Sequence, residues 1–590
     1  MTRANDAASA VVWRHVVLTV FVACAFLLPS LAPAQQAATA GAAIISEMDL
    51  VHPVFATEGM VATQEALATQ VGLDILRQGG NAVDAGVAVG FALAVTLPRA
   101  GNLGGGGFML VHDAGKDETA AIDFRETAPA AASRDMYLDS EGNVDEQRAR
   151  YSYLSVGVPG TVAGLALALE RYGTLTLEDV IAPAIALAQR GIQVGEDLAI
   201  TLSAAKERFS PWPESMKIFY KPDGQPYEIG DTLVQQDLGN SLRAIAEQGP
   251  SAFYEGEIAL KFVADMAVNG GLITVEDLKS YRAVIREPVR GSYRGYEIVS
   301  MPLPSSGGIH VIQILNLLES FPIAELGHNS AATIHRMAEA MKLAYADRSE
   351  YLGDTDFVEV PVQGLISKGY AAELVKQIDL ARARPAADIK PGDPAPYESD
   401  QTTHYSVMDQ NGNIVSTTYT INFSYGTGIT AAGTGILLNN EMDDFSAKPG
   451  VPNAYGLVGG EANAIEPGKR PLSSMTPSIV LQDGEPFLVT GSPGGSRIIT
   501  TVLQLIMNVV DHQMNVAEAS VAPRVHHQWL PDELRVEEGI SPDTARLLQE
   551  LGHTVSAQES MGSTQSIMRR EDGLYGYSDT RRRGSLTLGY

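Results

Sequence analysis

The strongest constraint on the fold of this chain comes from a segment in its last third. Two runs of alternating residues, 404–409 and 414–422, flank the pair Asn411-Gly412. Both residues of such a pair readily take positive φ angles, so an Asn-Gly pair between alternating runs is a strong signal of a β-hairpin. The sequence therefore predicts two antiparallel strands joined by a tight turn.

The register of this hairpin decides which side chains meet at its open end. If the Asn-Gly pair forms the turn, Thr402 faces Ile421, and Thr420 and Asn422 lie diagonally beside it. A β-bulge would shift this register by one residue. Three polar side chains, those of Thr402, Thr420 and Asn422, are therefore expected to converge.

The residues just before the hairpin differ sharply from it in composition. Residues 384–401 read RPAADIKPGDPAPYESDQ, with four prolines and several acidic residues. Proline removes a backbone donor and disfavours helix in the residue before it, so this segment is expected to be exposed and extended, without helix or strand. A cut in the chain would be tolerated at its end.

A threonine at the head of a strand, directly after such a linker, is a candidate nucleophile. Its hydroxyl reacts poorly unless a base removes the proton, and the threonine's own α-amino group is one economical base. That group exists only if the bond between Gln401 and Thr402 is cut, and its reference pKa of about 7.7 to 8.0 suits a base near neutral pH. The alternative is that Thr402 and Thr403 are ordinary strand residues, since threonine favours strands.

Other catalytic arrangements find less support in the sequence. A Ser-His-Asp triad would call for a Gly-x-Ser-x-Gly elbow, which the chain lacks. His526 and His527 are adjacent, so on a strand they would point to opposite faces, and without an HExxH motif no metal site is expected. Backbone N–H groups at Gly494 and Gly495 could form an oxyanion hole, although an ordinary glycine turn explains them equally well.

The first 34 residues have the layout of a secretory signal peptide. Arg3 and Arg14 precede an apolar run at 16–28, and the small-residue site Ala-Pro-Ala ends at residue 34. The apolar run is short for a membrane span, so export with cleavage is expected, and a membrane anchor is the alternative. The one cysteine of the sequence, Cys24, lies inside this run. Cleavage would therefore exclude disulfides and thiolate metal sites from the mature protein.

The charge balance excludes one class of partner. Lys and Arg total 42 against 70 Asp and Glu, for a formal net charge of −28, so the chain as a whole repels nucleic acid. With 590 residues, 45% of them hydrophobic, it can bury a core large enough for two or more domains or one large composite unit.

The region after the signal peptide predicts helices followed by two strands. Residues 60–97 have a helical apolar spacing that is interrupted at 79–81, which predicts two packed helices. Four glycines at 104–107 then precede a strand. Phosphate-binding loops follow a strand instead and need a lysine, so close backbone packing explains these glycines better. The second strand is expected to end near Arg125.

Two further segments frame the second half of the chain. Residues 449–460 are rich in glycine and proline around Tyr455, which predicts a mobile flap. The pair Asp483-Gly484 predicts a second hairpin over residues 479–490.

Ten short segments follow one another in a distinctive order. They are GGNAVDAGVAV, GGGGFML, DFRETAP, MPLPSSGGIH, AYADRSEYLGD, QTTHYSV, NNEMDDFS, RPLSSM, GSPGGSRI and GSTQSI. Together they resemble the γ-glutamyltranspeptidase family of N-terminal nucleophile hydrolases, over essentially everything after residue 50. The resemblance implies an α+β fold, a four-layer αββα sandwich built from two subunits of one self-cleaved precursor.

The resemblance also implies roles for individual residues. The precursor would cleave itself between Gln401 and Thr402, and Thr402 would then attack the substrate with support from Thr420. The other implied roles are the oxyanion hole (Gly494 and Gly495), the substrate α-carboxylate (Arg125, Ser473 and Ser474), the substrate α-amino group (Asn422, Glu441 and Asp444) and the lid (Tyr455). The chemistry fits, because guanidinium and hydroxyl groups donate to a carboxylate, whereas carboxylates and an amide oxygen accept from an ammonium.

The implied activity is transfer of the γ-glutamyl group of glutathione and related compounds to an amino acid, a dipeptide or water. It would proceed through an acyl-enzyme on Thr402, without cofactor or metal. The implied organisation is a signal peptide (1–34), a large subunit (35–401) and a small subunit (402–590). The two subunits would form one periplasmic or secreted heterodimer without a stable membrane anchor.

Two alternatives remain open at the level of the sequence. One is a cephalosporin acylase acting on glutaryl side chains, which have no α-amino group for Glu441 and Asp444 to bind. The other is a non-enzymatic periplasmic binding protein on the same scaffold, which would need no cut at Thr402.

Overall fold

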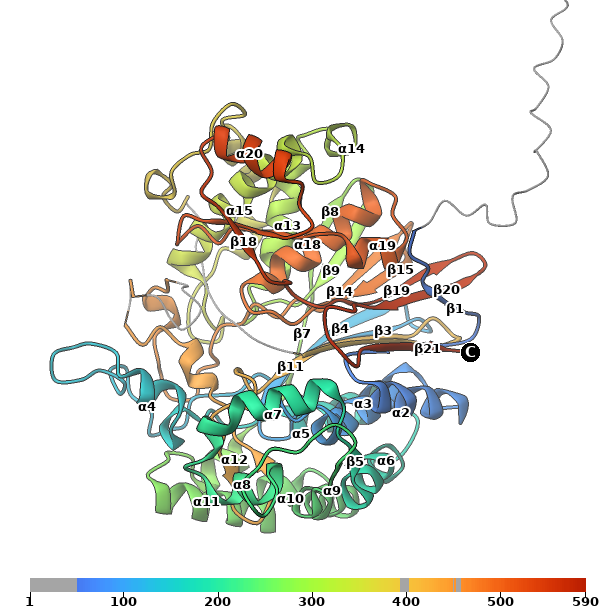
Figure 1. The fold of residues 1–590 in the computed structure, drawn as a ribbon, viewed down its shortest axis with the longest axis vertical. Coiled ribbons are helices and arrows are strands. Elements are labelled where there is room, and N and C mark those ends of the chain that lie inside the picture. The colour runs from blue at the N-terminus through green and yellow to red at the C-terminus, as the bar shows by residue number, and fades with distance from the viewer. Residues whose placement is uncertain (1–49, 393–402, 449, 452–457) are drawn as a thin grey trace, which may run out of the picture. The chain divides into compact units, whose positions relative to one another are not determined.

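Two seven-stranded antiparallel sheets lie face to face in the region from Val51 to Tyr590 (Figure 1). The structure, a computed structural model, describes residues 50–392, 403–448, 450–451 and 458–590. Sheet A has the order β1 (Val54–Ala56), β20 (Gly573–Ser578), β19 (Gln565–Arg570), β15 (Glu485–Thr490), β14 (Ser478–Gln482), β9 (Tyr296–Ser300) and β8 (Val289–Tyr293). Sheet B has the order β21 (Leu586–Gly589), β2 (Met60–Thr63), β10 (Thr403–Met408), β11 (Ile414–Thr420), β3 (Gly106–Asp113), β4 (Glu118–Asp123) and β7 (Val284–Arg286).

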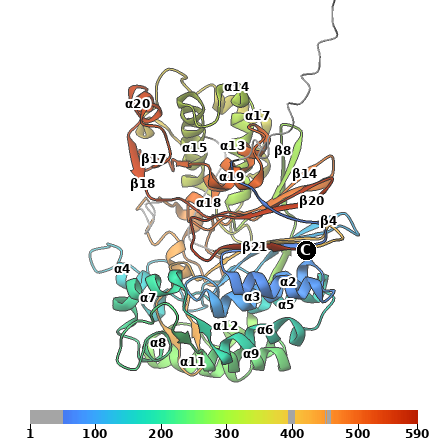
Figure 2. The same ribbon diagram turned by 45° about the vertical axis from the view of Figure 1, so that its right-hand side comes forward.

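Helices cover the outer face of each sheet, which gives four layers in the order αββα (Figures 1 and 2). On sheet B lie α2 (Ala66–Arg77), α3 (Ala82–Thr96) and α5 (Thr161–Tyr172). On sheet A lie α13 (Gly307–Leu318) and α19 (Val516–Val521), with α15 (Ala331–Tyr351) and α18 (Arg497–Val510) packed against α13. This arrangement confirms the predicted fold class.

The remaining elements extend these layers. Further helices are α4 (Glu146–Arg150), α6 (Leu177–Arg190), α7 (Glu196–Phe209), α8 (Pro213–Phe219), α9 (Gln236–Gln248), α10 (Ser251–Tyr254), α11 (Glu257–Asn269), α12 (Val275–Ser280), α14 (Ile323–Leu326), α16 (Val362–Leu365), α17 (Lys368–Val375) and α20 (Pro542–Glu550). Short strands are β5 (Ile192–Gln193), β6 (Thr232–Leu233), β12 (Thr430–Ala431), β13 (Ile436–Leu437), β16 (Val525–His526), β17 (Leu534–Glu537) and β18 (Val555–Gln558). None of the helices in the described residues combines the length and the apolar character needed to cross a membrane.

The predicted signal peptide, residues 1–34, lies outside the described part of the chain.

Alternate side chains of β10 point to opposite faces of sheet B and so pack into two different cores. Tyr405 and Val407 belong to the apolar core on the helix side of sheet B, whereas Met408 packs in the core between the sheets. Residues of the same parity as Met408 therefore face sheet A. Ser406 illustrates this, since its hydroxyl donates to the backbone carbonyl of Gln565 on β19 (2.9 Å).

The space between the sheets turns polar towards the start of β10. The two ring nitrogens of His404 lie 3.0 Å from the hydroxyls of Thr418 and Ser406. Burial lowers the pKa of His404 to about 3, so the ring is neutral and donates through one nitrogen while accepting through the other. The ring also lies against Gly491, where a Cβ would come within 2.4 Å of it. His404 thus connects β10 with the loop that follows β15.

The predicted hairpin is confirmed, but its register differs from the prediction by one residue. Thr403 pairs with Tyr419, and the strands are joined by a three-residue loop that ends at Gly412. The longer loop forms because Asp409 closes it: its N–H donates to the carbonyl of Asn413 and its carboxylate accepts the N–H of Asn413, both at 3.1 Å. Gly412 supplies the left-handed residue (φ 86°) that such a loop requires.

The predictions for residues 60–97 and 479–490 hold, except at the start of the first predicted helix. α2 and α3 meet at the predicted break, where Asn81 starts α3 through a reciprocal capping box with Asp84. Met60–Thr63 is a strand rather than part of a helix, because it pairs with both β10 and β21. Tertiary pairing outweighs the local helical spacing there. The second hairpin is confirmed as β14 and β15 around Asp483-Gly484.

The proline-rich linker is only partly as predicted. Ala386–Asp388 forms a short 3-10 helix, η2, in which Ala386 is buried. The backbone N–H of Ala386 donates to Asp532 (2.8 Å), and Trp529 Nε1 donates to its carbonyl (3.0 Å). The expectation of an exposed segment without helix is therefore wrong for this part, while residues 393–401 lie outside the described residues.

The glycine cluster brings backbones into direct contact, as predicted. A Cβ on Gly105 would lie 1.9 Å from the carbonyl oxygen of Thr420, and one on Gly104 would lie 2.2 Å from that of Leu437. Asn102 fastens the same contact, since its Nδ2 donates to the Thr420 carbonyl and its Oδ1 accepts the Gly105 N–H, both at 2.9 Å. The end of β11 therefore depends on glycine at position 105.

We expect Gly105→Ala to destabilise the protein by about 1 to 3 kcal/mol or more, because the added methyl group must displace backbone. Gly369→Ala in α17 is the matched control, since a Cβ there meets no atom within 4 Å. Thermal unfolding followed by circular dichroism should show a clear drop in apparent Tm for the first variant and none for the second. Equal Tm values for both variants would contradict the close packing at Gly105.

Candidate active site

Arg125 follows β4 and is completely enclosed, with a side chain that is 0% exposed. Its two terminal nitrogens pair with the carboxylates of Glu441 and Asp444. Its Nε donates to the carbonyl of Pro471 (3.0 Å), and one terminal nitrogen also donates to that of Leu472 (3.2 Å). The buried guanidinium that follows β4 is thus surrounded by two carboxylates and two backbone carbonyls from the second half of the chain.

The acidic partners of Arg125 stand at the two ends of a buried 3-10 turn, η3 (Glu441–Asp444). Burial raises the pKa of Glu441 against the lowering effect of Arg125. Burial by itself would lower the pKa of Arg125, yet the neighbouring carboxylates outweigh burial and raise it. The guanidinium and the carboxylates therefore depend on one another, because an unpaired charge in this interior would cost several kcal/mol.

Glu126 is a further buried acid at this site that the sequence analysis did not single out. Its carboxylate lies 3.8 Å from the nearest Arg125 nitrogen, and neither of its oxygens has a hydrogen-bond partner among the described residues. Burial raises the pKa of Glu126 to about 8, although Arg125 acts in the opposite direction. Glu126 is therefore protonated and uncharged at neutral pH. In the sequence, the only feature that pointed to a role for Glu126 was its position directly after Arg125.

Ser473 and Ser474 lie in the loop whose carbonyls hold Arg125. The Ser473 hydroxyl accepts the N–H of Met475 (3.1 Å), and its carbonyl accepts that of Ser306 at the start of α13 (2.7 Å). The Ser474 hydroxyl accepts a hydrogen bond from Arg348 of α15, a residue that the sequence analysis missed. Both serines are buried, so the loop is held by helices of the sheet A side.

Thr420 and Asn422 lie at the end of β11. The Thr420 hydroxyl accepts a hydrogen bond from the backbone N–H of Asn422 (2.8 Å). Asn422 itself has a left-handed backbone conformation, with φ 68°. The Asn422 side chain donates to the carbonyl of Asn440 (3.0 Å), the residue just before η3. This contact joins the end of the hairpin to the acidic turn that pairs with Arg125.

Gly494 and Gly495 form a buried turn just before α18. Both have positive φ angles, 135° and 69°, so glycine is required at these positions. α18 begins two residues later at Arg497, and the N-terminus of a helix carries a partial positive charge that favours an anion. Helix α15 connects this turn to the loop that carries Ser473 and Ser474. Tyr345 of α15 donates to the carbonyl of Ser496, and Arg348, which bonds Ser474, lies over the Tyr345 ring.

The structure brings most of the predicted binding residues into one network of contacts. Arg125, Glu441 and Asp444 touch directly, while the serines and Asn422 join them through adjacent backbone. The predicted residues Gln401, Thr402 and Tyr455 lie outside the described residues, so their placement is not part of this network.

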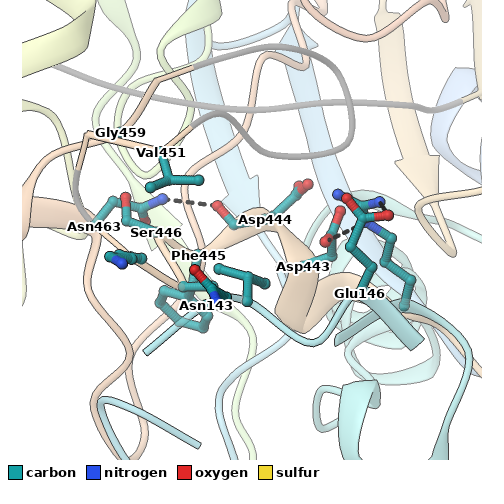
Figure 3. A pocket seen from close by; sticks show the side chains of 13 residues that line it. Asn143, Glu146, Asp443, Asp444, Phe445, Ser446, Val451, Gly459 and Asn463 are labelled. Carbon is teal, nitrogen blue, oxygen red and sulfur yellow. Dashed lines mark hydrogen bonds and ion pairs between the residues drawn. The ribbon is translucent and has the colours of Figure 1, made fainter. Parts of the chain in front are cut away.

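A cavity of about 220 Å³ adjoins Asp444 on the side of α4 (Figure 3). Arg150 of α4 donates through Nε to Asp443 (3.1 Å), and the Asn463 side chain donates to the Asp444 carbonyl (2.7 Å). Burial raises the pKa of Asp443 to about 7 despite Arg150. The acidic turn η3 is thus held from both sides, and neither Arg150 nor Asp443 was predicted from the sequence.

The adjacent histidines serve separate structural contacts. His526 Nδ1 lies 2.9 Å from the Thr500 hydroxyl, whereas His527 Nε2 lies 3.3 Å from Asp532. Burial lowers the pKa of both imidazoles. The two rings therefore do not form a common site.

Within the described residues, one other group could offer ligands to a metal ion: His335, Glu339 and His553. His335 Nδ1 and His553 Nε2 are only 2.7 Å apart, which is a hydrogen bond between the rings. Glu339 is paired with the ammonium of Lys342 (2.5 Å). Each of these three potential metal ligands already has a hydrogen-bond or ion-pair partner within the protein. We therefore assign the cluster a structural role.

Two facing antiparallel sheets between helical layers, with polar groups gathered at one edge of the sandwich, define the class of N-terminal nucleophile hydrolases. The sequence model described as gamma-glutamyltranspeptidase matches residues 68–588. The chain belongs to this family, and it is an enzyme of the γ-glutamyltranspeptidase type.

Individual relatives agree with this assignment. The chain is 59% identical over 545 residues to the glutathione hydrolase proenzyme of Escherichia coli (strain K12), covering 92% of this chain and 94% of that protein. Among solved structures, Helicobacter pylori γ-glutamyltranspeptidase has a TM-score of 0.55 and 46% identity over 59% of this chain and 97% of that chain. A cephalosporin acylase from Bacillus halodurans has a TM-score of 0.83 and 30% identity over 92% of this chain and 98% of that chain.

The raised pKa of Glu126 predicts a specific dependence of stability on pH. An acid whose pKa rises on folding, here from 4.5 to about 8, contributes stability that is present at low pH and lost as the pH rises through 8. Glu126→Gln removes this loss, so the variant should match the wild type in Tm near pH 5 and exceed it by at least about 2 °C near pH 9. Glu118→Gln, at the exposed start of β4, the strand that precedes Arg125 and Glu126, is the control and should show no such divergence. Parallel Tm curves for Glu126→Gln and wild type would show that Glu126 is ionised in the folded protein.

Proposed function

We propose that this protein is a self-processing γ-glutamyltransferase that also hydrolyses γ-glutamyl compounds such as glutathione. The observation that carries the proposal is the fully buried Arg125 held between Glu441 and Asp444. A γ-glutamyl group ends in an α-carboxylate and an α-ammonium, and this cluster offers a partner of opposite charge to each. The high identity to a glutathione hydrolase proenzyme supports the same substrate.

Substrate binding exchanges the internal ion pairs of the cluster for ion pairs with the substrate. In this proposal the α-carboxylate is held by Arg125, Ser473 and Ser474, and the α-ammonium by Asn422, Glu441 and Asp444. The substrate end is zwitterionic, so it brings one partner for each charge that it displaces. No net charge is added to the buried site, which avoids most of the desolvation cost of binding ions in a protein interior.

Thr402 is the proposed nucleophile. In the sequence it directly precedes Thr403, the first residue of β10. Cleavage of the bond between Gln401 and Thr402 creates an α-amino group that takes the proton of the Thr402 hydroxyl. Thr420, at the end of the neighbouring strand, supports the new N-terminus with its hydroxyl.

The proposed reaction has two steps. The Thr402 oxygen attacks the γ-carbonyl carbon, the bond to the leaving amine breaks, and the amine departs with a proton while the γ-glutamyl group stays on Thr402 as an ester. Backbone N–H groups at Gly494 and Gly495 stabilise the oxyanion in both steps, aided by the N-terminus of α18. An amino acid, a dipeptide or water then attacks the ester and restores the hydroxyl.

Self-cleavage would divide the chain into a large subunit (35–401) and a small subunit (402–590), preceded by a signal peptide (1–34). Strands of the two parts alternate in sheet B, where β10 and β11 lie between β2 and β3, so the cut pieces would stay together as a heterodimer. The word proenzyme in the name of the Escherichia coli relative supports processing. The signal peptide favours a periplasmic or secreted enzyme, and Tyr455 is proposed as part of its lid.

An acylase that acts on glutaryl groups is the competing function, because a cephalosporin acylase has the same fold over 92% of this chain. A glutaryl group keeps the carboxylate but lacks the ammonium. It would leave Glu441 and Asp444 without a cationic partner once the carboxylate has taken Arg125, so the site should reject it.

Turnover of two matched anilides decides between these functions. We expect kcat/KM for γ-glutamyl-p-nitroanilide to exceed that for glutaryl-p-nitroanilide by at least about 30-fold, since an unpaired buried charge costs roughly 2 to 5 kcal/mol. Asp444→Asn should narrow this ratio, because an amide pairs less strongly with an ammonium. A wild-type enzyme that prefers the glutaryl anilide would make the protein an acylase instead.

A further inference from the structure

Behind Arg125 lies a second charged network that the proposed roles do not yet explain. Asp123, the last residue of β4, is 0% exposed. Its Oδ1 accepts the backbone N–H of Arg125 (3.0 Å), and its Oδ2 accepts Nε of Arg286 from the neighbouring strand β7 (2.7 Å). The same Oδ2 lies 3.4 Å from Nε of Arg470. One buried carboxylate therefore joins the backbone of Arg125 to two further arginines.

Arg470 opens the loop that carries the two serines of the site. Its backbone N–H donates to Asp354 (2.9 Å), so the residue is held by its backbone as well as by its side chain. The next two residues, Pro471 and Leu472, present their carbonyl oxygens to the guanidinium of Arg125. Arg125 is thus held at its backbone by Asp123 and at its side chain by a loop whose first residue also contacts Asp123.

We propose that Asp123 is a positioning residue that sets the distance between Arg125 and the loop carrying Ser473 and Ser474. The inference rests on the proposed function, in which these three residues bind the substrate α-carboxylate. The two segments are 346 residues apart in sequence, from Arg125 to the carbonyl that its Nε meets, so the local chain cannot fix their spacing. Asp123 does not touch the carboxylate site itself and acts through Arg125 and Arg470.

The charge of Asp123, rather than its size alone, gives it this role. An asparagine could still accept the Arg125 N–H through its oxygen, but its NH₂ group would face the Arg286 and Arg470 guanidinium groups. Asp354 is already committed to the Arg470 backbone, and Asp356 lies on the outer side with a side chain that is 50% exposed. Asp356 also contacts both arginines, at 2.7 Å from Arg286 and 3.8 Å from Arg470, but it is not bonded to the Arg125 backbone. Without the charge of Asp123, the ion pairs that join the loop to the backbone of Arg125 are lost, and we expect the loop to move away from Arg125.

The test compares steady-state kinetics of the processed enzyme on γ-glutamyl-p-nitroanilide. We expect Asp123→Asn to raise KM at least about tenfold while kcat changes less than about threefold, because the change affects substrate capture rather than the nucleophile. Asp356→Asn is the matched control: Asp356 contacts the same two arginines, Arg286 (2.7 Å) and Arg470 (3.8 Å), but it is not bonded to the Arg125 backbone. It should leave KM within about twofold of wild type.

A second variant keeps the test decisive if Asp123→Asn is not processed into subunits. Arg470→Lys retains the positive charge but cannot reach both Asp123 and its other partners, and it should raise KM by about threefold or more. An unchanged KM in a processed Asp123→Asn enzyme, or in Arg470→Lys where the first variant does not mature, overturns the inference. A loss of kcat at constant KM overturns it as well. A wild-type enzyme that does not turn over the anilide would instead refute the proposed function.

Discussion

The ion pairing of Arg125 with Glu441 and Asp444 is the interaction on which the rest of this site depends. A guanidinium that is 0% exposed needs the two carboxylates that reach it, because an unpaired charge in a protein interior costs several kcal/mol. The same compensation explains why a zwitterionic substrate end suits the site. In the proposed complex each of its charges replaces an internal partner, so the charges of the cluster stay paired when a γ-glutamyl group is bound.

The fold supplies this cluster from elements that are far apart in sequence. Strand β4 brings Arg125, the acidic turn η3 follows the β12–β13 hairpin, and the serine loop precedes β14. They meet at the edge of the sandwich where the space between the sheets changes from apolar to polar, as His404 and its hydroxyl partners mark. Close contacts such as Gly105 against Thr420 keep the strand ends together. A site built at the end of packed strands is more rigid than one built on loops alone, which favours capture of a small, doubly charged group.

Much of the fold could be predicted from local sequence, because its signals act over a few residues. The Asn-Gly hairpin, the helix break at Asn81 and the close-packed glycines are of this kind. The hairpin register was wrong by one residue because the Asp409 side chain closes a longer loop, a contact that alternation does not reveal. Met60–Thr63 was assigned to a helix because its strand partners, β10 and β21, lie hundreds of residues away. Asp123, Glu126 and Arg348 were missed for the same reason: their roles depend on partners from distant segments. Thr402 was a candidate nucleophile from its place at a strand head after the linker, whereas the roles of the binding residues came from the family resemblance. All of these roles remain predictions.

The central claim is that cleavage before Thr402 creates the α-amino group that acts as base for the Thr402 hydroxyl. The most direct test is the intact mass of the purified protein, measured for the wild type and for Thr402→Ala. The account predicts two chains for the wild type, the smaller one beginning at Thr402, and brief exposure to a γ-glutamyl substrate should add one γ-glutamyl group to that N-terminal residue. The variant should remain a single chain without adduct. Two chains in the variant, or an adduct elsewhere in the wild type, would contradict the claim.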